Sequence, residues 1–317
     1  MKKKKISLVT PCLNEEKGIV ECYETIKKIF DTELSGYERE HIFCDNASSD
    51  RTVPLLKAIA LHDPCVKIIV NSRNFGILKN TYNGILSSTG DGIILMMPAD
   101  LQDPPELIPS FVKRWEEGYE IVYGIRARRE ENFLLERARK AYYQMLSKLT
   151  YVNYPPNVGD FQLIDKCVLN AMRQIDDVQP FMRIMTFDCG FKSFGISYTW
   201  RKRKHGKSRI GLPYLFDMGL NGIVSFSGAP LRMALIIGMI ISIISLIYSV
   251  SVFLLNVFGF LHDPRGIPTI VIALFFFGGV QLFFLGVLGE YIYAIYNQVR
   301  HKPLVIERER VNFASKP

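Results

Sequence analysis

The chain has 317 residues, of which 48% are hydrophobic and 22% are charged, and its formal net charge is +8. That length allows one large soluble domain together with additional structure. A positive charge would suggest a nucleic-acid partner in a soluble protein. Here we expect no nucleic acid, because basic residues beside apolar spans attract anionic lipid by about 1 kcal/mol each. The scattered cysteines form no CxxC pair, which argues against a disulfide framework and suits a reducing cytosol.

The N-terminal half has the pattern of a mostly parallel sheet. No apolar core follows Lys2–Lys5, so we expect no signal peptide. Short apolar runs then alternate with polar helical segments, which is typical of βαβ units. The predicted strands are Ile6–Pro11, His41–Asp45, Val66–Asn71, Ile93–Met97 and Glu120–Gly124.

Polar clusters follow the first, second and fourth of these strands. They are Asn14–Glu16, Asp45–Asp50 and the residues around Asp100. The carboxyl ends of parallel strands meet at one edge of a sheet, so the clusters should converge on one crevice. Neither GxGxxG nor GxxxxGK[ST] follows the first strand, so neither a dinucleotide fold nor a P-loop is supported. A cation and basic side chains would then have to hold any phosphates.

The segment Met96–Glu106 is the most informative of the three. In an extended chain Asp100 and Gln102 would point the same way, so their oxygens could both reach Mg²⁺ or Mn²⁺. The segment also reads as a strand followed by a helix start, with Asp103 as N-cap and Pro104 in the first turn. The two interpretations are compatible.

Two basic or amphipathic segments follow the sheet. Apolar residues recur at helical spacing over Asn132–Val152, with basic residues on the other faces. Such a helix can lie on a membrane surface, or pack on its own sheet with a solvated outer face. A second segment, Leu212–Ile223, leads towards the apolar C-terminal region and would set the soluble domain against a bilayer.

The C-terminal region predicts a membrane hairpin. Leu235–Leu261 and Ile267–Ile295 are apolar and each exceeds the roughly 20 residues that span a bilayer. The short linker between them places both termini on one side, and the flanking basic residues make that side cytoplasmic. We therefore expect a multi-pass protein of the inner (plasma) membrane. A homo-oligomer is compatible with two spans, although no pattern here specifies one.

These observations divide the chain into successive parts. The expected boundaries are a soluble α/β domain at 1–211, a juxtamembrane interface segment at 212–233, two transmembrane helices at 234–296 and a cytoplasmic tail at 297–317.

The order of motifs resembles the family 2 inverting glycosyltransferases with a GT-A (Rossmann-like) fold. Within that family it is similar to the polyprenyl-phosphate glycosyltransferases related to bactoprenol glucosyltransferase and dolichol-phosphate mannose synthase. The match runs nearly end to end and is specific as a set. The motifs that carry it are Pro11–Glu16, Asp45–Thr52, Ser72–Gly76, Ala99–Glu106, Gly159–Leu163, Arg203–Ser208 and Gly286–Tyr291.

The resemblance implies a nucleotide-sugar site, with a UDP-sugar favoured. Pro11, Glu15 and Asp45 would surround the base and ribose, and both carboxylates can accept hydrogen bonds from such groups. From the residues alone, Asn14–Glu16 could instead be a helix N-terminus, and Asp45 could simply cap its loop. The residues implied in donor binding are Pro11, Asn14, Glu15, Asp45, Arg73, Ala99, Asp100, Arg203 and Ser208.

The chain departs from the family pattern at two places. Pro98 replaces the first carboxylate of the usual Asp-x-Asp, so the implied metal ligands are Asp100 and Gln102. Mg²⁺ tolerates such a site because it commonly keeps several waters; otherwise metal affinity is weakened. Asn46-Ala47 stands where Asp-Gly is usual, and we assign Asn46 no metal role.

The resemblance also implies catalytic and acceptor residues. Asp160 matches the family's catalytic Asp, although from sequence alone it could be an ordinary loop residue, and Asp100 is the second candidate. Arg126, with Arg129 or Arg137, would bind the phosphate of the lipid acceptor, because guanidinium binds phosphate bidentately. Contact with lipid head groups is the alternative for these arginines.

The expected reaction is inverting transfer of a hexose from a nucleotide sugar to polyprenyl (undecaprenyl) phosphate, for modification of cell-envelope glycans. A phosphate monoester has its second pKa near 6, so it is already a nucleophile at cytosolic pH and needs no strong base. The alternatives are a family 2 transferase with a different acceptor and a non-catalytic membrane scaffold that binds sugar nucleotides.

Overall fold

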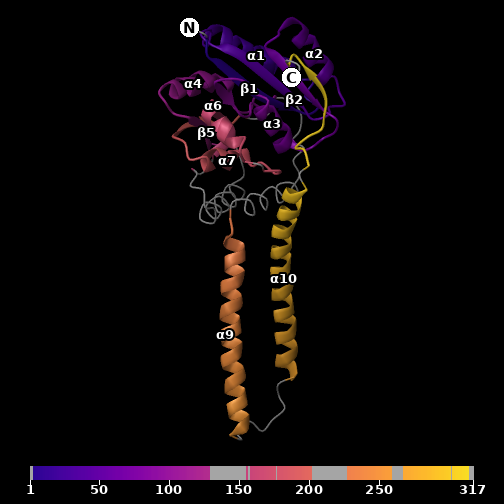
Figure 1. The fold of residues 1–317 in the computed structure, drawn as a ribbon, viewed down its shortest axis with the longest axis vertical. Helices are drawn as coiled ribbons and strands as arrows, with labels where there is room; N and C mark the ends of the chain where they lie inside the picture. The colour runs from indigo at the N-terminus through magenta and orange to yellow at the C-terminus, as the bar shows by residue number, and fades with distance from the viewer. Residues whose placement is uncertain are drawn as a thin grey trace. The chain divides into compact units, whose positions relative to one another are not determined.

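The structure is a computed structural model in which residues 3–128, 155, 158–175, 177–201, 227–258, 267–300 and 302–313 are described. The chain forms two compact units, one of residues 1–147, 152–215 and 301–317 and one of residues 148–151 and 216–300. The first unit carries the sheet, and the second carries two long helices (Figure 1). The predicted helices at 132–152 and 212–223 lie outside the described residues.

The first unit is built on an 8-stranded sheet of order β7-β5-β6-β4-β1-β2-β3-β8. The pairs β1–β2, β1–β4, β2–β3 and β5–β7 are parallel, whereas β4–β6, β5–β6 and β3–β8 are antiparallel. The predicted α/β class with a mostly parallel sheet is therefore confirmed. The strands are β1 Lys5–Cys12, β2 Glu38–Asp45, β3 Val66–Asn71, β4 Gly92–Ile94, β5 Ile121–Arg128, β6 Val158–Asp165, β7 Ser193–Thr199 and β8 Glu307–Val311.

Helices cover both faces of the sheet. Side chains of α1, α2 and α4 pack on one face, and side chains of α3, α6 and α7 pack on the other. Both faces of the central strands are thereby buried, which explains why these strands are nearly continuous apolar runs. The helices are α1 Ile19–Thr32, α2 Thr52–His62, α3 Ile77–Leu86, α4 Ile108–Glu116, α6 Lys166–Met172 and α7 Met182–Asp188, with the short 3₁₀ helix η1 Pro105–Leu107 before α4.

All five predicted strands exist, but β6, β7 and β8 were not predicted. Strand β6 lies antiparallel between β4 and β5. Its backbone also continues the pairing beyond β4, because Leu95 N donates to Gln162 O at 2.9 Å. The motif containing Asp160 is thus part of the sheet and not a loop.

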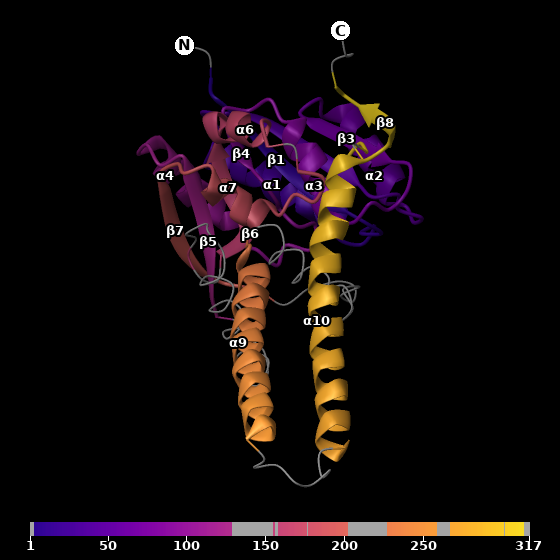
Figure 2. The same cartoon turned by 60° about the horizontal axis from the view of Figure 1, so that its bottom comes forward.

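The C-terminal strand β8 closes the outer edge of the sheet beside β3 (Figure 2). Asn312, just after the strand, donates from Nδ2 to the carbonyl oxygens of Ala60 and Val66, each at 2.9 Å. Lys57 Nζ also pairs with Glu309 Oε2 at 2.6 Å. The segment after the apolar helices therefore belongs to the same folded unit as the strands that precede them.

The second unit contains α9 Ala229–Val257, of 29 residues, and α10 Ile267–Val299, of 33 residues, which lie side by side (Figures 1 and 2). Their large apolar side chains are exposed; Leu282, for example, is 72% exposed. Among the described residues, one stretch, Phe276–Val299, is long and apolar enough to cross a membrane, whereas Ala229–Ile241 is apolar but shorter. One predicted span is thus supported, and the second remains a prediction.

Candidate functional site

The polar loops after β1 and β2 interlock at the carboxyl edge of the sheet. Asn14 N donates to Ser48 Oγ at 2.8 Å, and Ser49 N donates back to Asn14 Oδ1 at 2.7 Å. Asn14 has a φ of 55°, a left-handed conformation that asparagine tolerates well. Helix α1 begins at Ile19, directly after a turn in which Glu15 O accepts from Gly18 N at 3.0 Å and from Ile19 N at 2.9 Å. The alternative interpretation, a helix N-terminus, is therefore supported for Glu15 and Glu16 but not for Asn14.

Asp45 ends β2 at the base of these loops and is fully buried. Burial raises the pKa of its carboxyl, against the hydrogen bonds from Ser48, which lower it. Ser48 N donates to Asp45 Oδ2 at 2.9 Å, so the residue does cap its loop, as the simpler interpretation expected. The other carboxylate oxygen, Oδ1, lies 3.9 Å from Cys12 Sγ. Pro11 is buried beside them in β1.

Asn46 holds the loop that follows β3. Its Oδ1 accepts from Phe75 N at 3.0 Å, and its Nδ2 donates to Asn74 Oδ1 at 2.8 Å. Asn71 Nδ2 also donates to Asn46 Oδ1, at 3.2 Å. The amide thus supplies both a donor and an acceptor to this loop, whereas Ala47 has a φ of 65°, a conformation that favours glycine. The predicted donor-binding residue Arg73 is exposed on the same loop, with its guanidinium 3.9 Å from the Phe75 ring centre.

The Asp100 segment lies against the loop that follows β1. A Cβ on Gly18, at the start of α1, would be 3.4 Å from Ala99 O, so the two loops are in close contact. The chain is not extended here, because Leu101 has a φ of 53°. The expectation that Asp100 and Gln102 share a face by strand alternation was therefore wrong. Instead, Gln102 N donates to Asp100 Oδ1 at 3.2 Å.

Asp100 and Gln102 remain the predicted cation ligands. Gln102 Nε2 donates to Arg201 O at 3.2 Å, which leaves Oε1 as the acceptor end of the amide. Within the described ranges, no three His, Cys, Asp or Glu side chains are grouped to hold a metal. A cation held by Asp100 and Gln102 would have one carboxylate from these two residues and take further oxygens from substrate and water, which suits Mg²⁺.

Asp103 is not the helix N-cap that the sequence suggested. Pro104 occupies that position before η1, and the Asp103 side chain is fully buried. Its Oδ2 pairs with Arg126 Nη2 at 3.0 Å, and Tyr198 donates a short hydrogen bond to Oδ1. A buried guanidinium requires a carboxylate partner, and that requirement takes precedence over capping.

The Arg126 guanidinium therefore binds Asp103 and Tyr198 inside the protein. It extends from β5, its side chain is 11% exposed, and its guanidinium also lies 5.3 Å from the Trp200 ring centre. Burial and the neighbouring Asp103 raise the pKa of Tyr198 above its ordinary value, against the effect of Arg126. The acceptor-binding role of Arg126 remains a prediction. Arg129 and Arg137, predicted for the same role, lie outside the described residues.

Asp160 projects from β6 and pairs with Arg183 of α7. The sequence analysis did not identify Arg183 as a site residue. Arg183 Nη2 lies 2.6 Å from Asp160 Oδ2, and Arg183 Nε donates to Oδ1 at 3.3 Å. The two side chains are 11% and 13% exposed. A lone arginine in the apolar run Phe181–Met185 was the signal that could have pointed to this pair.

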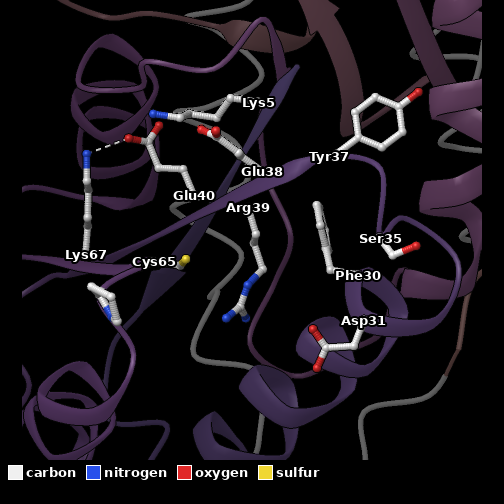
Figure 3. A pocket seen from close by; sticks show the side chains of 11 residues that line it. Lys5, Phe30, Asp31, Ser35, Tyr37, Glu38, Arg39, Glu40, Cys65 and Lys67 are labelled. Atoms are coloured by element: carbon white, nitrogen blue, oxygen red, sulfur yellow. Dashed lines mark hydrogen bonds and ion pairs between the residues drawn. The ribbon is translucent and has the colours of Figure 1, made fainter. Parts of the chain in front are cut away.

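A separate cavity of about 580 Å³ lies at the opposite edge of the sheet (Figure 3). Its lining includes Lys5, Glu38 and Lys67 from the amino ends of β1, β2 and β3. Lys67 Nζ and Glu40 Oε1, from the neighbouring strands β3 and β2, pair at its wall at 2.5 Å (Figure 3). In parallel α/β sheets ligands bind at the carboxyl ends of the strands, so this cavity is not the candidate site.

Residues 7–173 match the family described as glycosyl transferase family 2. This chain belongs to that family. It is 34% identical over 311 residues to the uncharacterized glycosyltransferase YkcC of Bacillus subtilis (strain 168), covering 98% of this chain and 95% of the relative. It is 33% identical over 308 residues to the bactoprenol glucosyl transferase of Shigella phage SfV, covering 96% of this chain and 99% of the relative.

Among solved structures, the fold is similar to a glucosyl-3-phosphoglycerate synthase from Mycobacterium tuberculosis in complex with Mn²⁺, uridine diphosphate and phosphoglyceric acid. The identity is 20% and the TM-score 0.49, over 70% of this chain and 76% of the other.

Membership of glycosyl transferase family 2 confirms the expected enzyme class, glycosyltransferase. This interpretation takes the place of the alternative of a non-catalytic scaffold. The sheet order together with the family match makes the fold GT-A-like. The individual site residues remain predictions. Two of them, Arg203 and Ser208, lie outside the described residues.

Proposed function

We propose that this glycosyltransferase moves a hexose from a UDP-linked donor to polyprenyl phosphate, with inversion at the anomeric carbon. The observation that carries the proposal is the 33% identity to the bactoprenol glucosyl transferase of Shigella phage SfV, which covers 96% of this chain. That coverage includes the apolar helices as well as the sheet. The likeness therefore extends to the part of the chain suited to a lipid substrate.

The donor would bind over the carboxyl ends of β1, β2 and β4. Asp45 and Glu15 would accept hydrogen bonds from the base and ribose, and Arg73 would reach the nucleotide from the loop that Asn46 holds. The interlocked loops hold Asp45 in place, and its side chain is fully buried. The loops would therefore have to open for the base to reach this carboxylate.

A divalent cation would bind at Asp100 and Gln102 and neutralise charge developing on the leaving diphosphate. The same two residues hold the local turn, because Gln102 N donates to Asp100 Oδ1 at 3.2 Å. With Pro98 in place of a second carboxylate, the site depends on oxygens from the donor. We therefore expect the cation to bind more tightly when the nucleotide sugar is present.

The acceptor phosphate would enter beside Asp160 and Arg126. A phosphate monoester is largely a dianion near neutral pH, so the acceptor needs no base to remove a proton from it. Asp160 would instead orient a substrate. Arg126, with Arg129 or Arg137, would attract the phosphate. The bond from the anomeric carbon to the diphosphate breaks as the bond to the acceptor phosphate oxygen forms.

The protein would sit in the inner membrane with both ends in the cytoplasm. The chain leaves the sheet-bearing unit after β7 and returns to it as β8, so an intervening segment that spans a bilayer would cross it an even number of times. Helices of 29 and 33 residues are about 44 and 50 Å long, more than the hydrocarbon thickness of about 30 Å. Two crossings, by α9 and α10, meet both conditions.

The deciding experiment is transfer of label from a panel of radiolabelled nucleotide sugars to undecaprenyl phosphate by the detergent-purified protein. It is run with Mg²⁺, Mn²⁺ or EDTA. Metal-dependent label in the lipid fraction from one donor would establish the acceptor class and identify the sugar. Tight donor binding without lipid product from any donor would contradict the proposal and favour a family 2 enzyme with another acceptor.

A further inference from the structure

Asp160 and Arg183 form a two-point ion pair that is nearly buried. Two nitrogens of one guanidinium face the two oxygens of one carboxylate, at 2.6 and 3.3 Å. Both side chains are nearly buried, at 13% and 11% exposure. A forked contact of this kind sets the plane of a carboxylate as well as its position.

Arg183 is itself held by the strand that carries Asp160. Gln162, two residues further along β6, donates from Nε2 to Arg183 O at 3.4 Å and to Gly159 O at 3.1 Å. Its Oε1 accepts from Thr186 Oγ1 at 2.8 Å. Gln162 and Thr186 are fully buried, and buried amides are costly unless bonded. Helix α7 is therefore fixed to β6 at the turn that presents Arg183.

The guanidinium of Arg126 lies close to Gly159, the residue before Asp160, but forms its ion pair with another carboxylate. A Cβ on Gly159 would lie 3.2 Å from Arg126 Nε, a tight contact that would require the Arg126 side chain to shift by a few tenths of an ångström. Arg126 forms its short-range ion pair with Asp103 and bonds to Tyr198. Among the described residues, Arg126 and Arg183 form ion pairs with different carboxylates, those of Asp103 and Asp160.

We propose that Arg183 is a positioning residue, which orients the Asp160 carboxylate and cancels its charge where the acceptor phosphate enters. This rests on the proposed transfer to a polyprenyl phosphate. An uncompensated carboxylate would repel a phosphate dianion, whereas an ion pair does not. Gln162 and Thr186 hold Arg183 in place. Arg183 acts through Asp160 and does not touch the reacting atoms.

The test is a double-mutant cycle on the full-length detergent-purified enzyme, with Arg183→Met, Asp160→Asn and the two combined. We expect Arg183→Met to lower kcat/KM for polyprenyl phosphate by about 100-fold, while KM for the nucleotide sugar changes little. In the Asp160→Asn background the same change should have almost no further effect, since the carboxylate it orients is already altered. Arg173→Met is the control, because Arg173 bonds to Leu86 O and Ser88 O at a distance from Asp160 in the fold.

Chemical rescue separates positioning from folding. Added guanidinium ion should restore part of the activity of Arg183→Ala and none of the activity of Asp160→Asn. If Arg183→Met no longer binds donor by calorimetry, Arg183→Lys takes its place in the cycle, with a smaller loss expected because one contact and the charge remain. An equal loss in both backgrounds, with no rescue by guanidinium, would overturn this inference while leaving the proposed function intact. A parent enzyme that makes no glycolipid from any donor would instead overturn the proposed function, and this inference with it.

Discussion

Arg126 and Asp103 form a largely buried ion pair, with Nη2 3.0 Å from Oδ2, the Asp103 side chain fully buried and the Arg126 side chain 11% exposed. The pair joins the loop after β4 to strand β5, which lie on either side of β6 in the sheet. The loop that carries the predicted metal ligands Asp100 and Gln102 is thus joined, through Asp103, to Arg126, which is predicted for acceptor binding.

Breaking this pair should destabilise the domain. Asp103→Asn leaves a buried guanidinium without its counter-charge, and such changes cost about 3–5 kcal/mol. We expect a loss of that size in urea unfolding of the purified protein. Glu117→Gln, which breaks the exposed pair with Arg114, is the matched control and should cost no more than about 1 kcal/mol. Equal losses for the two variants would contradict the structural importance of the buried pair.

Removing the only carboxylate proposed for the cation should abolish metal-dependent transfer. Asp100→Asn is expected to lower kcat by about 10²–10³-fold, the usual effect of losing one group that stabilises developing charge. The measurement is glycolipid formation against Mg²⁺ concentration. Asp31→Asn changes an exposed carboxylate at the opposite edge and should leave the titration unchanged. An Asp100→Asn enzyme that keeps full metal-dependent turnover would place the cation elsewhere.

Asn46 should matter for donor binding through the loop that it holds. Asn46→Ala leaves Phe75 N and Asn71 Nδ2 without this acceptor, a loss of about 1–3 kcal/mol for buried groups, and should raise KM for the nucleotide sugar. Asn46→Asp keeps the acceptor and loses only the donor to Asn74, so we expect a smaller change. Thermal unfolding and initial rates measure the two effects. A larger effect of the Asp variant would mean that charge, and not the loop contact, governs this position.

The C-terminal strand should be needed for a stable catalytic domain. A chain that ends before Glu307 loses β8 and leaves the edge of β3 open, which favours pairing with other copies. We expect a lower melting temperature and aggregates in light scattering. Asn312→Ala should have a milder effect, because it removes only the bonds to Ala60 O and Val66 O. Glu309→Gln breaks one exposed pair with Lys57 and is the control. Normal melting of the shortened chain would refute the prediction.

Mild acid should destabilise the fold through His41. Burial, with a smaller effect of Arg39, holds the pKa of this imidazole well below its ordinary value of 6.5. The unfolded chain takes up a proton near that value while the folded chain does not, so stability is full above it. Stability then falls by about 1.4 kcal/mol for each further pH unit below it.

Urea unfolding between about pH 7.5 and 5.5 measures this loss. His41→Gln should reduce the pH dependence, whereas changing the exposed His62 to Gln should not. If the slope with pH is the same in His41→Gln as in the parent protein, another group is responsible.

Much of the sheet could be predicted because its strands are defined by local apolar runs. Ile6–Pro11 and Val66–Asn71 are buried on both faces, and their sequences show it. Strand β8 could not be predicted, since Glu-Arg-Glu-Arg-Val reads as a charged tail. It becomes a strand because β3 supplies backbone partners and Lys57 and Asn83 supply partners for its acidic side chains.

Side-chain pairing in the candidate site was likewise beyond local patterns. Asp103 precedes two prolines, a position where an aspartate usually caps a helix. It instead forms an ion pair with Arg126 of strand β5. Leu101 takes a left-handed conformation. The segment is therefore not extended, and Asp100 and Gln102 do not share a face by strand alternation. The Asp103–Arg126 pair joins residues that are far apart in the sequence, so local patterns do not show it.

The amino-acid sequence by itself determined the α/β class, the carboxyl edge where polar loops gather, the apolar C-terminal helices and the glycosyltransferase family. These depend on periodicity and on motifs of consecutive residues, which short stretches of chain specify. Only the tertiary structure decided that Arg183 pairs with Asp160, that Asp103 pairs with Arg126, and that the C-terminus completes the sheet. Each of these contacts brings a buried charge or an open strand edge to a partner remote in sequence, and burial makes such a partner necessary.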